Sequence, residues 1–317
     1  MSLAVVTPSY KHDAELFGDL HSSVLRLTDD SVMHYAVVPA ADVELFKGIV
    51  GERGVVIPEE SLYPAHYKAI RGVNPVVRFL PFVPAHARIA AVNIKNLRRP
   101  VRGWMMQQLL KLEFCRQLQV DTVVLVDSDV ELVRPISEAT FRNGERARLY
   151  RRLNTVDDSM PVHMEWIKTS RDLLGLPEGQ FPASEYVSSL CVWEPKVVRA
   201  LLARVEQVTG RQWMDAITAQ RTFSEWTLYG VFAEEVMKYP EGNLTESSLC
   251  LSYWGHSNGD NPPLTLAGAM EFVSHLKVDD VAVLIQSKTR TPRTIRRVAI
   301  EAIGGEANAH GDHAHRI

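Results

Sequence analysis

Two carboxylates, Asp127 and Asp129, stand one residue apart directly after the apolar run at residues 122–126. The run is rich in valine and shows no polar alternation, which is typical of a strand covered on both faces. In open α/β sheets ligands bind at the carboxyl ends of the strands, and the pair is expected at such an end. Two neighbouring hard oxygen ligands suit Mn²⁺ or Mg²⁺, cations that also accept diphosphate oxygens. An acidic turn without a ligand is the alternative.

The segments before this motif alternate between strand and helix patterns. Strands are predicted by apolar runs at residues 3–7, 34–39, 76–81 and 122–127. Helices are predicted at 14–27, where Leu16, Leu20, Val24 and Leu27 have helical spacing, at 42–50 and at 104–119. This alternation predicts an α/β fold with a mostly parallel central sheet that helices cover on both faces.

The rhythm changes after Pro135. Strands are predicted at 148–152 and 186–193, and helices at 196–207 and 226–238. Because no linker or repeat interrupts the chain, we expect one domain over residues 1–303, with a nucleotide-binding half (1–135) and an acceptor half (136–303). Residues 304–317, with Gly, Asn, Asp and three His, predict a mobile tail.

Composition excludes several classes of function. The chain has 317 residues, of which 46% are hydrophobic and 23% charged, as in an ordinary globular protein. A formal net charge of −3 gives no reason to expect nucleic acid or an anionic membrane as a partner. The local basic stretch is interpreted as a solvated face, with a phosphate-rich partner as the alternative: it contains Lys288, Arg290, Arg293, Arg296 and Arg297.

The cysteines and the N-terminus bear on the cellular location. Cys115, Cys191 and Cys250 have no metal-like spacing and lie in apolar stretches, so buried free thiols in a reducing compartment are expected. No apolar run approaches the ~20 residues that a membrane span needs. The first residues show neither a basic region nor a cleavage site, which indicates the cytoplasm.

Residues 4–10 resemble the first strand and nucleotide loop of GT-A glycosyltransferases, and the Asp127-Ser128-Asp129 motif resembles their Asp-x-Asp motif. The resemblance implies a Rossmann-like, three-layer α/β/α fold with a variable C-terminal half. It also implies a nucleotide-diphosphate sugar as donor and Mn²⁺ or Mg²⁺ as cofactor. The loop residues implied to meet the nucleotide are Thr7, Pro8, Ser9 and Tyr10, of which Tyr10 would stack on a uracil-like ring.

Residues 103–112 are similar to the helix that precedes the Asp-x-Asp strand in bacterial GT-A-like families. Gln108 and Lys111 are three positions apart and therefore share a helix surface. A cation there could meet a diphosphate or a sugar hydroxyl. A solvated lysine on an amphipathic helix is the alternative.

Residues 224–230 look like the acidic helix start found late in GT-A domains. Ser224 could cap this helix, and Glu225 would occupy its first turn, where the helix dipole favours a carboxylate. In inverting members of the family such an acid is the general base that takes the acceptor proton. Helix stability alone also explains a glutamate there. For a retaining reaction the sequence nominates no nucleophile.

His256 is the candidate for a third metal ligand, because many GT-A enzymes supply a C-terminal histidine. A loop histidine bonded only to backbone is the alternative. The segment departs from the His-x-x-Gly-x-x-Lys-Pro-Trp ending of glycogenin-like members. His256 and Gly259 match its start, but Pro262 stands where the lysine would meet the diphosphate.

Aromatic residues interleaved with polar ones follow the Asp-x-Asp motif, as a sugar acceptor requires, since pyranose faces stack on rings. Trp166, Tyr186 and Trp226 are the predicted acceptor-side residues. Core packing explains each of them equally well.

Three other functions share parts of this pattern. Haloacid-dehalogenase-type phosphatases also place Asp-x-Asp after a strand, but they usually have Gly where Val130 stands here and a small or β-branched residue where Glu131 stands. A nucleotidyltransferase would need a glycine-rich basic loop after its first strand, and this chain has residues 7–10 there instead. A binding module without catalysis would bind the nucleotide sugar and not turn it over.

Overall fold

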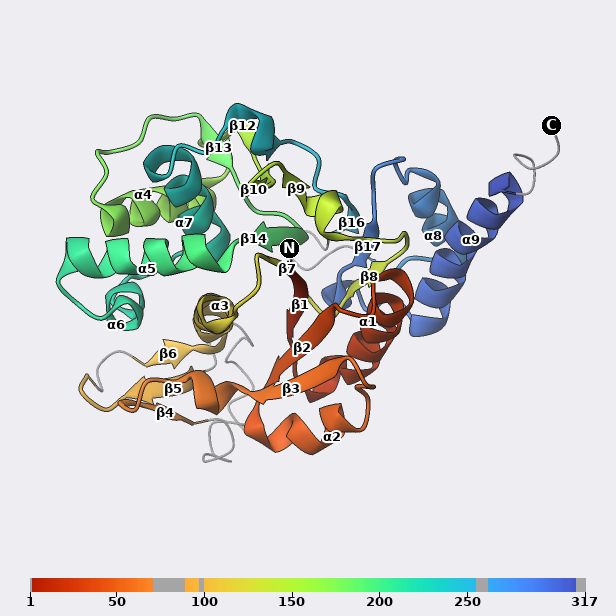
Figure 1. The fold of residues 1–317 in the computed structure, drawn as a ribbon, viewed down its shortest axis with the longest axis horizontal. Coiled ribbons are helices and arrows are strands. Elements are labelled where there is room, and N and C mark those ends of the chain that lie inside the picture. Colours follow the sequence, from red (N-terminus) through yellow and green to blue (C-terminus); the bar gives the residue numbers. More distant parts are fainter. Residues whose placement is uncertain (1, 71–88, 97–99, 255–261, 312–317) are drawn as a thin grey trace.

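A five-stranded sheet in the order β14-β7-β1-β2-β3 forms the centre of the computed structural model, which describes residues 2–70, 89–96, 100–254 and 262–311 (Figure 1). Strands β1, β2, β3 and β7 are parallel, and β14 closes one edge antiparallel to β7. The predicted α/β fold with a mostly parallel central sheet is confirmed. The strands span Leu3–Pro8 (β1), Met33–Val38 (β2), Gly54–Pro58 (β3), Thr122–Val126 (β7) and Leu190–Trp193 (β14).

Successive side chains of the central strands point into two separate cores, which explains the apolar runs without polar alternation. Val6 and Val123 belong to the core formed with α3, α5 and α7, whereas Val5 and Val124 belong to the core formed with α1. Helices thus cover both faces. They span Ala14–Leu27 (α1), Val43–Lys47 (α2), Gly103–Gln117 (α3), Pro161–Leu174 (α4), Pro195–Thr209 (α5), Trp213–Thr218 (α6) and Glu225–Val231 (α7).

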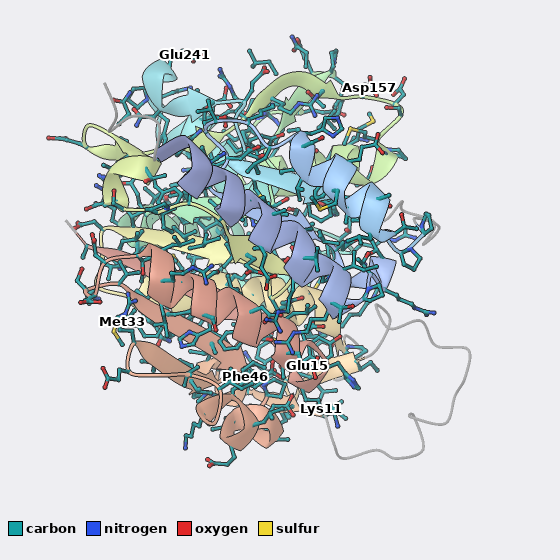
Figure 2. All side chains as sticks on the ribbon, turned by 90° about the vertical axis from the view of Figure 1, so that its right-hand side faces the viewer. Lys11, Glu15, Met33, Phe46, Asp157 and Glu241 are labelled. Carbon is teal, nitrogen blue, oxygen red and sulfur yellow. The ribbon has the colours of Figure 1, made fainter. Side chains whose placement is uncertain are left out.

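A second sheet continues from the end of β7. Its order is β16-β17-β8, with bounds Cys250–Tyr253, Ala282–Ile285 and Val130–Leu132. Helices α8 (Leu266–Ser274) and α9 (Arg293–Gly311) pack against it. Figure 2 shows α9 beside α1, where Arg293 Nε and Nη2 donate to the Asp19 carboxylate at 2.7 and 2.6 Å.

The basic stretch is therefore only partly a solvated face, which corrects the interpretation from the sequence. Arg293 is paired with Asp19, and Arg296 is 8% exposed. None of the helices in the described part of the chain has the length and apolar character that a membrane span requires. All three cysteines are buried and free, as expected.

Shorter elements surround the two sheets. A three-stranded sheet orders β4-β5-β6 with bounds Tyr67–Ala69, Ile89–Asn93 and Val101–Arg102. Three strand pairs contain β9 (Arg142–Asn143) with β10 (Arg146–Ala147), β11 (Leu149–Tyr150) with β15 (Leu244–Thr245), and β12 (Arg152–Val156) with β13 (Ala183–Glu185).

Several predicted boundaries differ from the observed ones. The strand predicted at 186–193 is β14 alone, and β13 ends before it. The helix predicted at 226–238 ends at Val231 and continues as a π-helix, Phe232–Val236. Helix α9 extends beyond residue 303 into the predicted tail, and the strand predicted at 76–81 lies outside the described residues.

Candidate active site

The Asp127-Ser128-Asp129 turn lies at the point where the central sheet changes direction of winding. The chain passes from β1 to β2 and β3 on one side of β1, and then returns to place β7 on its other side. Such a switch point opens a crevice at the carboxyl ends of the two central strands. The turn closes with a bond from Val130 N to Asp127 O of 3.2 Å, and β8 then leaves for the second sheet.

Two motifs that are 119 residues apart meet in this crevice. Ser128 Oγ donates to Ser9 Oγ at 2.7 Å, and both side chains are buried. Ser9 N donates in turn to Val37 O at 2.9 Å. The loop after β1 is thus fixed to the turn after β7, with the Tyr10 ring 44% exposed beside them.

The other two loop residues face the interior. Pro8 is buried, and Thr7 Oγ1 lies 3.0 Å from His34 Nε2. His34 Nδ1 lies 2.9 Å from His21 Nδ1, and Gly51 N donates to His21 Nε2 at 3.1 Å. Because the backbone amide can only donate, His21 must carry its proton on Nδ1 and His34 on Nε2, so that each donates toward Thr7.

Burial lowers the pKa of both histidines. The pKa of fully buried His34 falls to about 3, with His21 as the second cause, and that of His21 falls through burial and then the charge of Arg53. Both rings are therefore neutral at physiological pH. Of the four predicted loop residues, Tyr10 is the one with an exposed side chain.

Lys111 lies between two carboxylates. Its Nζ is 3.2 Å from Asp127 Oδ1 and 3.3 Å from Glu225 Oε1, and 5% of its side chain is exposed. The alternative of a solvated lysine is therefore wrong. Although burial alone would lower the pKa of Lys111, the charges of Asp127 and Glu225 outweigh it and raise that pKa.

Gln108 fixes the beginning of α7. Its Oε1 accepts a hydrogen bond from Glu225 N at 3.0 Å, and Ser224 Oγ accepts one from Thr227 N at 3.3 Å. The predicted cap by Ser224 is confirmed. Glu225 itself is 2% exposed, and burial raises its pKa against the lowering effect of Lys111.

Asp129 is supported from the C-terminal part of the chain. Its Oδ2 accepts the backbone N–H of Ser287 at 2.7 Å, and Arg296 lies close enough to lower its pKa. Burial and the charge of Asp127 act more strongly and raise the pKa of Asp129 to about 6. Burial raises the pKa of Asp13, and the charge of Asp127 adds to the rise, so a third carboxylate lies nearby.

The residues present fit a divalent cation in the donor types they offer. Asp127 Oδ1 is buried against Lys111, whereas 37% of the Asp127 side chain is exposed, which leaves Oδ2 open to a ligand. Repulsion among Asp127, Asp129 and Asp13 is what a bound cation would relieve. Within the described ranges no three His, Cys, Asp or Glu side chains form a ready metal-binding cluster. His256 lies outside the described residues.

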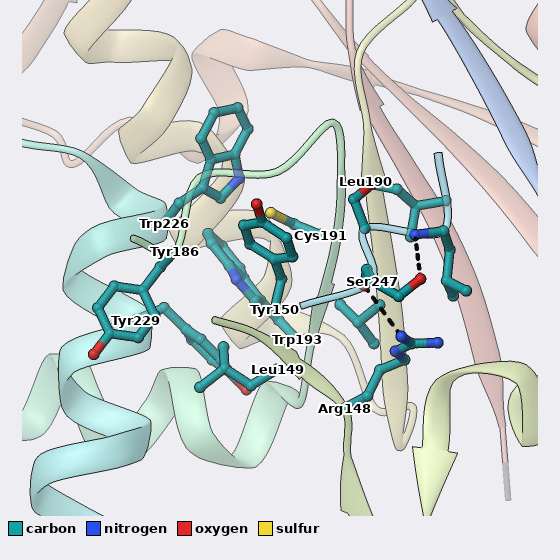
Figure 3. A pocket seen from close by; sticks show the side chains of 13 residues that line it. Arg148, Leu149, Tyr150, Tyr186, Leu190, Cys191, Trp193, Trp226, Tyr229 and Ser247 are labelled. Carbon is teal, nitrogen blue, oxygen red and sulfur yellow. Dashed lines mark hydrogen bonds between the residues drawn. The ribbon is translucent and has the colours of Figure 1, made fainter. Parts of the chain in front are cut away.

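The predicted acceptor-side residues occupy two places. Trp226 covers Lys111, with Nζ 4.5 Å from its ring centroid, and its Nε1 is buried without a hydrogen-bond partner in the described chain. Figure 3 shows Trp226, Tyr186 and Trp193 lining a pocket that also includes Arg148. Asp127, Asp129 and Lys111 are not among its lining residues.

Tyr186 is held by contacts that no local pattern reveals. Its hydroxyl donates to Glu234 Oε2 at 2.8 Å, and its ring packs against Gly230, where an added Cβ would lie 2.3 Å from the ring. Trp166 lies apart from this pocket, on α4, where it stacks near Trp104 at a centroid distance of 5.8 Å.

The sequence did not predict that Ser287 and Asp13 lie near the Asp127-Ser128-Asp129 turn, or that Trp104 lies near Trp166. Ser287 acts through its backbone, which carries no residue-specific signal. Arg296 had a signal, since it belongs to the basic stretch, but its pattern did not indicate that it reaches Asp129.

Comparison with known proteins gives one family match. The model of a family described as of unknown function, DUF6492, matches residues 2–254. No curated protein matches the chain.

Similar solved structures include three glycosyltransferases. The apo bifunctional glycosyltransferase WbbM is 17% identical with a TM-score of 0.42, and the match covers 89% of this chain and 45% of WbbM. Mouse xyloside xylosyltransferase 1, also apo, is 13% identical with a TM-score of 0.45, covering 92% and 100%. The galactosyltransferase LgtC, in complex with donor and acceptor sugar analogues, is 10% identical with a TM-score of 0.41, covering 96% and 95%.

Proposed function

This chain belongs to DUF6492, a family of unknown function, and we propose that it is a glycosyltransferase of the GT-A type. A sugar would move from a nucleotide-diphosphate donor to a hydroxyl acceptor, with Mn²⁺ or Mg²⁺ held by Asp127 and Asp129. The observation that carries the proposal is the hydrogen bond between Ser128 and Ser9. It seats the paired carboxylates beside the Tyr10 loop at the switch point, where nucleotides bind in open α/β sheets.

The donor half of the site needs a ring for the base and positive charge for the diphosphate. Tyr10 offers an exposed ring. Among the described residues, the carboxylates Asp13, Asp129 and Glu225 surround Asp127, and the permanent cations that act on them there are Lys111 and Arg296. A bound divalent cation would supply the missing positive charge and stabilise the leaving diphosphate. His256 remains the proposed third ligand.

Lys111 holds the donor half and the catalytic half together. Its ammonium neutralises Asp127 Oδ1 and at the same time orients Glu225 Oε1. For an inverting reaction Glu225 remains the proposed general base, and its raised pKa favours accepting a proton. Because Lys111 Nζ contacts Oε1, the second oxygen, Oε2, would take the acceptor proton.

A thermal-shift titration with UDP and GDP, with and without Mn²⁺, tests the donor site. Nucleotide at a hundred times its Kd should stabilise the fold by about 2.7 kcal/mol, and only when Mn²⁺ is present. Asp129→Ala and Asp127→Asn should abolish the effect. Asp30→Asn is the matched control, because the Asp30 side chain is fully solvent-exposed. Stabilisation that ignores Mn²⁺, or survives both substitutions, contradicts the proposal.

Product analysis separates this function from its alternatives. A glycosyltransferase releases nucleoside diphosphate from a nucleotide sugar, slowly to water and faster with an acceptor. A phosphatase would release inorganic phosphate from simple phosphoesters without any nucleotide. The strand order favours the first outcome, because β1, β2 and β3 precede β7, whereas the phosphatase nucleophile follows an early strand. A binding module would release neither product.

A further inference from the structure

Trp104 is an exposed aromatic residue at the start of α3, a helix whose central positions are mostly buried. On α3 it is 41% exposed, whereas Met105, Met106 and all positions from Gln108 to Cys115 are buried. An indole left in water keeps a large apolar area unburied, and an exposed aromatic patch commonly marks a binding site. The exposed indole of Trp104 is therefore suited to bind a ligand with an apolar face.

A second indole lies next to it. The rings of Trp104 and Trp166 have centroids 5.8 Å apart and an interplanar angle of 29°. Trp166 Nε1 donates to Thr222 Oγ1 at 2.9 Å, so its ring cannot turn freely. His163, one turn earlier on α4, adds a third ring at 4.4 Å from Trp166.

Polar groups border the two indoles. His163 Nδ1 is hydrogen-bonded to Glu185 Oε2, and Glu185 Oε1 accepts the backbone N–H groups of Tyr186 and Val187 at 2.8 and 2.7 Å. These contacts fix the His163 ring and leave its Nε2 without a partner among the described residues. His163 Nε2 is thus a hydrogen-bonding group with a fixed orientation at the edge of the aromatic surface.

Both indoles connect to the catalytic half of the candidate site. Trp104, Gln108 and Lys111 stand at positions i, i+4 and i+7 of α3, so they lie along one face of the helix. Seven residues of α-helix rise about 10 Å. Thr222, the partner of Trp166, lies three residues before Glu225.

We infer that Trp104 and Trp166 form a platform for a sugar ring of the acceptor, one ring beyond the sugar that receives the transferred group. The assignment of this sugar ring to the acceptor rests on the proposed function. The apolar face of a pyranose would stack on the indoles, and one of its hydroxyls would meet His163 Nε2. The spacing of about 10 Å from Lys111 suits a disaccharide or a longer glycan, with its reacting ring beside Glu225.

Binding to a printed array of oligosaccharides, followed by saturation-transfer NMR on the bound glycans, tests the platform in the absence of donor and Mn²⁺. Wild-type protein should bind glycans of two or more rings, with saturation transferred to the protons of one sugar face. Trp104→Ala should weaken this binding at least tenfold, and Trp166→Phe, which removes the bond to Thr222, should weaken it as well. Leu45→Ala is the matched control, because Leu45 is 47% exposed on α2, far from α4 in Figure 1.

The platform and the donor site are tested by separate measurements, so one proposal can be overturned while the other stands. Absence of glycan binding by the wild type, or binding that Trp104→Ala leaves within twofold, overturns the platform. A second sample contains UDP in place of the glycan. If saturation is transferred to the base protons of UDP and Trp104→Ala abolishes this transfer, the two indoles hold the nucleotide and the platform is also overturned. Mn²⁺-dependent stabilisation by UDP should be unchanged in Trp104→Ala, so a failed platform leaves the donor-site result standing.

Discussion

Lys111 Nζ lies 3.3 Å from Glu225 Oε1, with both side chains buried. The same ammonium lies 3.2 Å from Asp127 Oδ1, so one cation joins the turn after β7 to the first turn of α7. Removing one member of a buried ion group leaves a charge without its partner, which is far more costly than losing an exposed pair. Lys111 therefore stabilises the packing of these two segments through a buried ion group.

Lys111→Met should lower the free energy of unfolding by about 3–5 kcal/mol, because Glu225 and Asp127 lose their buried counter-charge. Urea denaturation measures the change. Lys47→Met is the control, since Lys47 pairs with Glu44 at the surface and its loss should cost less than about 1 kcal/mol. Adding Glu225→Gln to Lys111→Met should cost little more than the single change, and full additivity would contradict the coupling.

Glu225→Gln should reduce transfer to the acceptor by about 10²–10⁴-fold if Glu225 is the general base. Since the base must be ionised and burial raises its pKa above 4.5, kcat/KM in the wild type should fall as pH drops through that raised pKa. Steady-state kinetics across pH measure both effects. Mn²⁺-dependent binding of UDP should persist in the variant. Transfer that stays within threefold of the wild type would assign Glu225 to holding Lys111 alone.

The His34 and His21 pair should make the fold sensitive to acid. The pKa of His34 is about 3 in the folded chain and about 6.5 in the unfolded chain, so only the unfolded chain takes up the proton between these values. The contribution of neutral His34 to the free energy of unfolding is fully present above pH 6.5. Below pH 6.5 this contribution falls by about 1.4 kcal/mol per pH unit. The raised pKa values of Asp129 and Glu131 act with the opposite sign over the same range.

The histidine effect is therefore measured as a difference between variants. Urea denaturation at pH 7.5, 6.5 and 5.5 should show that the free energy of unfolding gains less, or loses more, per unit of rising pH in His34→Gln than in the wild type. His12→Gln, which changes an exposed histidine, should keep the wild-type slope. Equal slopes in all three proteins would show that His34 does not stay neutral.

Gly230→Ala should destabilise the fold by about 1–3 kcal/mol, because the added Cβ would lie 2.3 Å from Cγ and Cδ1 of the Tyr186 ring. Thermal unfolding measures the loss. Gly48→Ala is the control, because a Cβ there first meets Leu45 O at 3.4 Å. A change at Gly230 within 0.5 kcal/mol of the control would mean that Tyr186 moves aside at little cost.

The sequence predicts those parts of the fold whose signal is local. The valine-rich β1 and β7, and the periodic pattern of α1, predict their elements within one or two residues. Parallel strands of one sheet end at the same edge, so the neighbourhood of the Tyr10 loop and Asp127 also follows from pattern alone. The π-helix after Val231 has no such signal, because its turns use the same residues as an α-helix.

The candidate site depends on pairings that periodicity cannot contain. A lysine in a helix looks the same whether it is solvated or buried, and Lys111 is buried because α7 and β7 both face it. Gln108 is predicted at the nucleotide, yet the structure uses it to bind Glu225 N. Such contacts are decided when elements distant in sequence pack together, which no single segment encodes.

The hydrogen bond from Ser287 N to Asp129 Oδ2 joins residues 158 positions apart. During synthesis Asp129 therefore leaves the ribosome long before the amide that orients it. Ser287 and Arg296 also lie outside the family match at residues 2–254, whereas Asp127 and Asp129 lie within it. A nascent chain that has emerged only to residue 254 would hold both aspartates without this support, and the turn that carries them would acquire its final geometry among the last events of folding.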